Sequence, residues 1–224
     1  MTRDKSIGWA EETWNPYTGC NRGCPYCYAR DMHHRFEKLW KYDFTPQVHL
    51  DRFDEPFRWV KPRRVFVGSM GEIFALSDYH VWNLLEIMDL NEQHQFLVLT
   101  KMSERIKDFQ YPPNVWLGVT VTGSQDEYRI LDLLQSKARI KYVSFEPLLY
   151  NCRNDLDLCG INWVIIGGCR RINYPKPFPK FVPPREWVEP IITEARRVGA
   201  AVFLKDNLEW NQPIREWPEE EGLS

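Results

Sequence analysis

Six short apolar segments rich in β-branched residues recur along this chain, and helix-like segments separate several of them. Apolar runs of four to eight residues are typical of strands buried on both faces. They lie at residues 64–68, 95–100, 115–121, 141–145, 162–166 and 201–204. Between them, apolar residues recur at helical spacing over residues 78–90, 124–135 and 184–198. This alternation predicts an α/β fold with a parallel sheet.

Polar residues or glycines lie at the end of nearly every predicted strand or directly after it. They are Ser69 and Glu72, Thr100 and Lys101, Thr120 and Thr122, Ser144 and Glu146, Gly167 and Gly168, and Lys205. Ligands bind at the carboxyl ends of parallel strands in open sheets and in barrels alike, but polar groups from many strands favour a barrel over a single crevice. We therefore predict a partial (β/α) barrel of about six or seven parallel strands, in one domain spanning residues 1–224.

The Pro-rich stretch 174–184 interrupts this pattern. Proline disrupts a helix interior and cannot donate to the hydrogen bonds of a central strand. We expect this stretch to be a connection over the surface, or a lid over the site.

Charge and hydropathy limit the class of protein. The 29 Lys and Arg residues against 31 Asp and Glu give a formal net charge of −2, so binding of nucleic acid would need a local basic patch. The first residues are charged and do not resemble a secretion signal, and no stretch approaches 18 consecutive apolar residues. We expect a cytoplasmic protein with no membrane partner.

Three of the six cysteines, Cys20, Cys24 and Cys27, form a Cys-x3-Cys-x2-Cys motif. Cysteines clustered in this way indicate a metal site more than a set of disulfides. Three local thiolates suit a [4Fe–4S] cluster that leaves one iron open, whereas structural zinc takes four protein ligands. Zinc remains an alternative, with His33, His34 or a distant cysteine as its fourth ligand.

With Tyr26 before the last cysteine, the motif resembles the signature of the radical SAM superfamily. The resemblance implies that the three cysteines hold three irons, that S-adenosylmethionine chelates the fourth iron, and that Tyr26 lies near the adenine. One electron then releases methionine and a 5′-deoxyadenosyl radical. A barrel and a helix after the motif, expected at residues 28–39, are also implied.

A second motif, Gly68-Ser69-Met70-Gly71-Glu72, resembles the "GGE" element of that superfamily, whose backbone and acidic side chain accept hydrogen bonds from the amino group of S-adenosylmethionine. From about residue 7 to residue 207, the successive motifs WNPYTGC, CPYCYA, GSMGEIF, LVLTK, VWLGVTV, SFEPLL and WVIIGG are similar to a phage-associated radical SAM family of unknown function. That family usually follows the Gly-Gly pair with an acidic residue, Ser and Gly. This chain has Cys169-Arg170-Arg171 there, which leaves the role of this loop open.

The remaining candidates are ranked by the chemistry of the strand ends. Thr100 and Lys101 suit the carboxylate of S-adenosylmethionine, and Thr120 suits its ribose. Glu146 suits the ribose hydroxyls or acid–base work on a substrate. Cys169 is a candidate donor of a hydrogen atom, while Cys152 and Cys159 suit either an auxiliary cluster or ordinary packing.

The sequence thus predicts a radical SAM enzyme that takes electrons from a donor such as flavodoxin or ferredoxin and abstracts hydrogen from an unidentified substrate. Nucleic acid is one candidate substrate, since aromatic residues such as Trp9 and Trp14 lie near the cysteines and Arg170 and Arg171 follow a strand end. Two other hypotheses are a zinc-bearing nucleic-acid-binding module and a non-catalytic iron–sulfur protein that transfers electrons.

Overall fold

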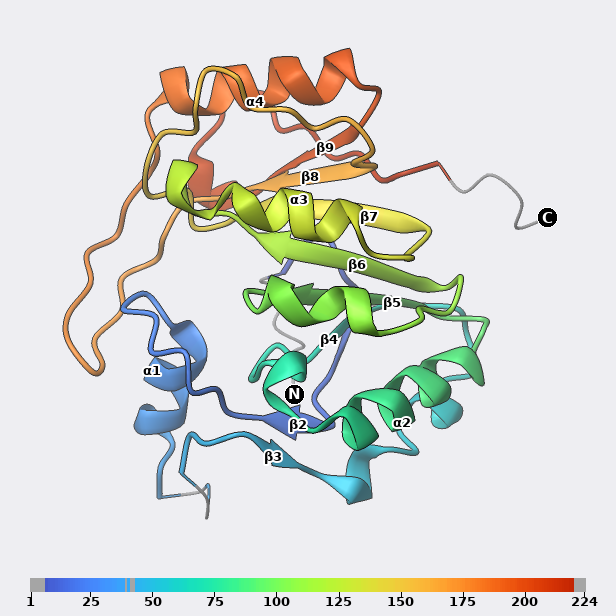
Figure 1. Cartoon of the computed structure of the whole chain (residues 1–224). Helices are drawn as coiled ribbons and strands as arrows, with labels where there is room; N and C mark the ends of the chain where they lie inside the picture. Colours follow the sequence, from blue (N-terminus) through green and yellow to red (C-terminus); the bar gives the residue numbers. More distant parts are fainter. Residues whose placement is uncertain (1–6, 39, 41–42, 220–224) are drawn as a thin grey trace.

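A single curled sheet of seven parallel strands forms a half-barrel in the computed structural model, which describes residues 7–38, 40 and 43–219 (Figure 1). The spatial order of its strands is β1-β4-β5-β6-β7-β8-β9. Their bounds are β1 Glu12–Trp14, β4 Arg64–Val67, β5 Gln95–Thr100, β6 Val115–Thr120, β7 Ile140–Phe145, β8 Trp163–Ile166 and β9 Ala201–Leu204. The predicted partial (β/α) barrel is therefore confirmed.

Three helices, α2 (Asp78–Asp89), α3 (Tyr128–Leu134) and α4 (Arg185–Arg197), pack on the outer face of this sheet (Figure 1). In α2 the buried residues Val81, Leu84, Leu85 and Met88 form the apolar stripe expected from their spacing. Helix α1 (Tyr28–Arg35) lies instead beside the carboxyl ends of the strands, on the left in Figure 1. A small antiparallel pair, β2 (Tyr17–Thr18) and β3 (Gln47–Val48), completes the regular structure near α1.

Several predicted elements differ from the observed ones at their ends. The predicted helix 124–135 is a 3₁₀ turn, Ser124–Asp126, followed by the shorter helix α3, because the Asp126 carboxylate turns back to accept from the backbone N–H and hydroxyl of Thr122. The helix predicted at 28–39 ends at Arg35, and residue 39 lies outside the described residues.

The inner face of the sheet changes from aromatic to small and polar along the central strands β6 and β7. At the amino ends a buried aromatic cluster contains Trp9, Phe66, Trp116, Tyr142, Trp163 and Phe203. Side chains alternate between faces, so the inner face of β6 continues from Trp116 to Gly118 and Thr120, and that of β7 from Tyr142 to Ser144. A Cβ on Gly118 would lie 2.4 Å from the Tyr142 ring. The aromatic side chains therefore form a floor, and the space for a ligand lies above it at the carboxyl ends.

Segments from both ends of the chain meet at the amino side of the half-barrel. Residues 214–216 pair with β9 through backbone bonds from Leu204 N–H to Ile214 O, 2.9 Å, and from Glu216 N–H to Val202 O, 3.0 Å. The indole N–H of Trp217 points to the carbonyl oxygen of Trp9, 3.5 Å away. These contacts reinforce the aromatic floor on the side where the barrel is open.

Within the described part of the chain, every helix is too short or too polar to cross a lipid bilayer.

Candidate functional site

The cysteine loop is fastened to the carboxyl edge of the half-barrel at Gly19. Gly19 donates its N–H to the carbonyl oxygen of Met70, 2.9 Å, and accepts from the N–H of Glu72, 3.2 Å. This isolated parallel bridge places Cys20 directly beside the turn of residues 68–72. The two motifs singled out in the sequence therefore meet, although many residues separate them along the chain.

Two further side chains hold this junction together, and neither was singled out from the sequence. The side-chain oxygen of Asn15 accepts from the Ser69 hydroxyl and from the Met70 N–H, both at 3.1 Å. The Tyr28 hydroxyl donates to the carbonyl oxygen of Ser69. Asn15 directly follows β1, so its position would have been informative if that strand had been recognised.

The three thiols of the motif lie on one loop but face different surroundings. Cys20 lines a cavity of about 600 Å³ together with Arg30, His33 and His34. Cys24 lines another cavity, of about 480 Å³, beside Tyr26. Cys27 caps the amino end of α1. Among the described residues, no group of three His, Cys, Asp or Glu side chains is close enough to hold a metal ion.

The chemistry of the loop nevertheless fits iron–sulfur ligation. The Cys20 sulfur accepts from the backbone N–H of Arg22, 3.3 Å, and the Cys27 sulfur accepts from that of Arg30, 3.4 Å. Hydrogen bonds to sulfur of this kind are among the features that tune iron–sulfur clusters. Burial raises the pKa of the Cys20 thiol, the hydrogen bond from the Arg22 N–H opposes this shift, and the negative charge of Glu72 adds to it. Iron binding would therefore have to displace a proton from Cys20.

His33 and His34, the suggested extra ligands for zinc, make aromatic contacts. The ring of His33 lies 5.3 Å from Trp40 and 5.5 Å from Phe44, centroid to centroid. The ring of His34 stacks on Tyr174 at 3.8 Å. These contacts explain both histidines by packing, and they give no specific support to zinc.

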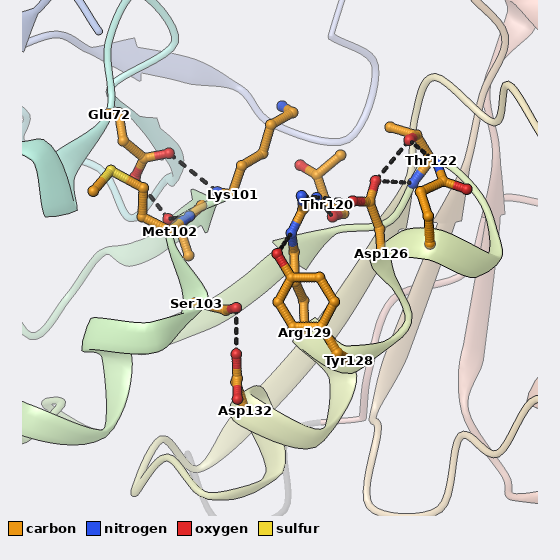
Figure 2. A network of polar contacts seen from close by, with 12 residues as sticks. Glu72, Lys101, Met102, Ser103, Thr120, Thr122, Asp126, Tyr128, Arg129 and Asp132 are labelled. Atoms are coloured by element: carbon orange, nitrogen blue, oxygen red, sulfur yellow. Dashed lines mark hydrogen bonds and ion pairs between the residues drawn. The ribbon is translucent and has the colours of Figure 1, made fainter. Parts of the chain in front are cut away.

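Glu72 lies inside the protein and links two strand ends (Figure 2). Its carboxylate accepts from the Thr100 hydroxyl at 2.7 Å, from the Lys101 N–H at 3.1 Å and from the Phe74 N–H at 3.4 Å. Burial raises the pKa of this carboxyl, and the three donors oppose the shift. The roles predicted for Glu72 and Thr100 in ligand binding stay predictions, since both side chains already have partners within the protein.

Lys101 and Tyr26 meet between the cysteine loop and β5. The Lys101 ammonium lies 5.9 Å from the centre of the Tyr26 ring, and in Figure 2 its side chain extends away from Glu72. Its positive charge therefore lies beside the cysteine loop. This placement suits the predicted contact of Lys101 with a carboxylate.

Cys24 and Tyr26 share their cavity with residues that follow β6. Its wall includes Thr122, Gln125, Asp126 and Arg129. Asp126 and Arg129 form a buried ion pair of 2.6 Å, and Arg129 also donates to the Thr120 carbonyl at 2.7 Å (Figure 2). The Thr120 hydroxyl itself is buried and has no hydrogen-bond partner among the described residues. The sequence analysis did not identify this ion pair, because it predicted one continuous helix over residues 124–135 where the structure has a 3₁₀ turn at Ser124–Asp126.

Farther along the carboxyl edge of the sheet, after β7 and β9, Glu146 and Lys205 form an ion pair, with the ammonium 2.6 Å from the carboxylate. Cys169 lies near this pair, is 5% exposed, and points its sulfur at the carbonyl oxygen of Arg170, 3.2 Å away. Burial raises the pKa of Cys169 to about 11, and the charge of Glu146 adds to the shift. Cys169 is therefore a protonated thiol at neutral pH.

We expect iodoacetamide to modify Cys169 slowly near neutral pH. With a pKa of about 11, roughly one thiol in a thousand is a thiolate at pH 8, and the rate should rise about tenfold per pH unit up to about pH 10. Peptide mass spectrometry of modified protein measures this rate, with the exposed Cys159 as the internal control. A Cys169 rate equal to that of Cys159 at pH 7.5 would contradict the protonated state.

Residues 169–181, here termed the strap, cross from the end of β8 to α1, where the orange trace descends beside α1 in Figure 1. The buried carboxylate of Asp31 in α1 accepts from the backbone N–H groups of Asn173 and Tyr174, both at 3.0 Å. Phe178 packs edge-on against Tyr26 with ring centroids 6.2 Å apart. The Pro-rich stretch predicted as a connection or lid thus overlaps a segment that contacts the cysteine loop.

Comparisons with known proteins give one match. A family model described as a protein of unknown function (DUF5131) matches residues 4–222. No curated protein and no solved structure matches the chain.

Proposed function

The chain belongs to the DUF5131 family of proteins of unknown function, and from its own residues we propose that it is a radical SAM enzyme in which Cys20, Cys24 and Cys27 hold a [4Fe–4S] cluster. When it is bound and reduced by one electron, this cluster supplies the means to cleave S-adenosylmethionine into methionine and a 5′-deoxyadenosyl radical. The electron would come from a small donor such as flavodoxin or ferredoxin.

One observation carries the proposal. The bridge between Gly19 and Gly71 joins the cysteine loop to the turn of residues 68–72 at the carboxyl edge of a half-barrel. Active sites of barrels lie at that edge. The carboxyl edge therefore brings together a loop of three thiols, a glycine-rich turn and several polar strand ends. If the two motifs served only for packing, they would not need to lie side by side.

Each residue of this junction has a proposed task. The three sulfurs bind iron, which requires Cys20 and Cys24 to turn toward each other from the two cavities they now line. The backbone carbonyls of Gly68, Ser69, Met70 and Gly71 are candidate acceptors for the amino group of S-adenosylmethionine. The first three already accept one hydrogen bond each within the protein, so they would use their second lone pair. Lys101 pairs with its carboxylate, and the cavity beside Tyr26 takes its adenosine, with the unpartnered Thr120 hydroxyl close to the ribose.

Glu146 and Cys169, which follow β7 and β8 at the carboxyl edge, are the residues proposed to act on the substrate. Glu146 provides a carboxylate within reach of an incoming polar group. The buried thiol of Cys169 keeps its proton at neutral pH, as a donor of a hydrogen atom requires.

The proposal predicts that anaerobically reconstituted protein forms 5′-deoxyadenosine from S-adenosylmethionine and dithionite. Chromatographic quantification should show 5′-deoxyadenosine forming at a rate well above that in a control mixture without the protein. The Cys24→Ala variant should give none, because one ligand of the cluster is missing. If the cluster forms fully but never cleaves S-adenosylmethionine, even when cell extract is added as a source of substrate, the result would favour an electron-transfer protein. Tightly bound zinc in place of iron would favour the zinc-bearing nucleic-acid-binding module.

A further inference from the structure

The ion pair of Glu146 and Lys205 spans the end of β8. Glu146 directly follows β7 and Lys205 directly follows β9, and both side chains lie on the inner face, in line with Ser144 and Phe203. Between them, Gly167 directly follows β8, and a Cβ on Gly167 would lie 3.0 Å from Cγ of Glu146. The absence of a side chain at residue 167 therefore gives Glu146 the room to reach across to Lys205.

Stability does not account for two charges at this position. The side chains are 16% and 23% exposed, and the loss of hydration offsets much of the attraction in a partly buried pair. Pairs near a surface contribute about 0–1 kcal/mol. An ammonium group carries three N–H donors, so Lys205 keeps donors beyond those that Glu146 engages.

Two buried hydroxyls lie on the same face of the sheet as the pair. Ser144 and Thr120 are paired in register on β7 and β6, and their exposed fractions are 1% and 0%. Among the described residues, neither hydroxyl has a hydrogen-bond partner. An unpaired buried hydroxyl costs about 1–3 kcal/mol, and this cost disappears when a ligand supplies an acceptor. Both lie on the inner face, one pleat below the level of Glu146.

The other charged groups on this side of the site already have partners. Arg170 holds its guanidinium 5.4 Å from the centre of the Tyr28 ring and 3.9 Å from the Asp31 carboxylate. The Asp31 carboxylate also accepts from two backbone N–H groups and pairs with Arg35 at 3.2 Å. Glu146 is thus the carboxylate that neutralises Lys205.

We propose that Lys205 binds an oxyanion of the substrate, a carboxylate or a phosphate group, and that Glu146 occupies Lys205 until this anion arrives. The ligand group is recognised by the Lys205 ammonium together with the hydroxyl of Ser144, whereas the Thr120 hydroxyl on the neighbouring strand stays assigned to the ribose of S-adenosylmethionine. The assignment of this anion to a substrate rests on the proposed radical enzyme, whereas the anion site itself rests on the geometry of β7 and β9.

The test is the protection of Lys205 from acetylation by N-hydroxysuccinimidyl acetate, measured by peptide mass spectrometry on iron-reconstituted protein. Inorganic phosphate and acetate are titrated separately, against chloride at matched ionic strength because salt alone screens charges. We expect phosphate or acetate, depending on the group recognised, to protect Lys205 and to leave the exposed Lys176 on the strap unchanged.

Glu146→Gln removes the competing carboxylate with little change in shape, and circular dichroism checks that it is folded. It should lower the anion concentration for half-protection of Lys205 about fivefold, the equivalent of about 1 kcal/mol of competing ion pair. Equal protection of Lys205 and Lys176, or no protection in either protein, would overturn the anion site. Protection without formation of 5′-deoxyadenosine would leave the anion site standing and count against the radical chemistry alone.

Discussion

Replacement of Cys24 by alanine is expected to abolish the binding of iron. A [4Fe–4S] cluster on this chain would have three protein ligands, all within Cys20–Cys27, so the loss of one leaves two thiolates and two open irons. Anaerobic reconstitution of the unchanged protein should give close to four irons per chain and a brown colour. The variant should retain less than about a tenth of that iron, measured by a colorimetric iron assay and by absorbance near 400 nm.

Cys159→Ala is the matched control for this experiment. Cys159 is an exposed free cysteine on the loop before β8, where its sulfur lies 3.5 Å from a guanidinium nitrogen of Arg197. It is outside the proposed ligand set, so its loss should leave the iron content unchanged. Equal iron in the Cys24→Ala variant and in the unchanged protein would refute the proposed cluster, and equal losses in both variants would show that iron binds thiols nonspecifically.

Gly19→Ala is expected to destabilise the protein and to prevent iron binding while all six cysteines remain. Gly19 has a φ of +86°, and a Cβ there would lie 1.9 Å from the carbonyl oxygen of Thr45. The left-handed conformation costs a non-glycine residue about 1–2 kcal/mol, and the clash with a backbone atom adds to it. We expect a loss of at least about 3 kcal/mol in the free energy of unfolding. This loss corresponds to a decrease in Tm of roughly 6–12 °C, measurable by calorimetry.

Gly199→Ala is the control that separates the cost of the left-handed backbone from the cost of the steric clash in the expected loss of stability. Gly199 has a similar φ of +74°, but nothing lies within 4 Å of a Cβ placed on it. It should lose only the backbone term, about 1 kcal/mol or 2–4 °C in Tm, and its iron content should be normal. If Gly19→Ala bound iron as well as Gly199→Ala, the junction of Gly19 with residue 71 would not be needed for the site.

The strands predicted from the sequence are those that form a continuous apolar run. β5 and β9 have the predicted bounds, and β4, β6, β7 and β8 differ by one residue at one end, because each is apolar on both faces. β1 was not predicted, since it has three residues and begins with Glu12 and Thr13. Its position is fixed by parallel pairing with β4, a distant contact that local periodicity cannot reveal.

For the site, spacing located the motifs but not the contacts between them. The cysteine spacing and the glycines of residues 68–71 identified two segments, and the structure brings those segments together. The orientation of Glu72 could not be predicted, because a carboxylate at a strand end is equally able to face a ligand or the Thr100 hydroxyl. The pairing of Asp126 with Arg129 depends on a 3₁₀ turn whose residues also have helical spacing. The partner of Lys205 depends on the absence of a side chain at Gly167, a strand away from either charge.

The aromatic floor of the half-barrel limits the routes by which a molecule can reach the inner face of the sheet. Trp163 is fully buried, and the rings of Trp9, Trp116, Tyr142 and Phe203 surround it with centroids 5.6–6.2 Å from its own. Because these rings fill the amino end, a molecule on the inner face enters and leaves past the carboxyl ends of the strands or through the open side of the half-barrel. The strap and α1 border the first of these routes, so a bulky substrate would have to approach from the open side or displace the strap.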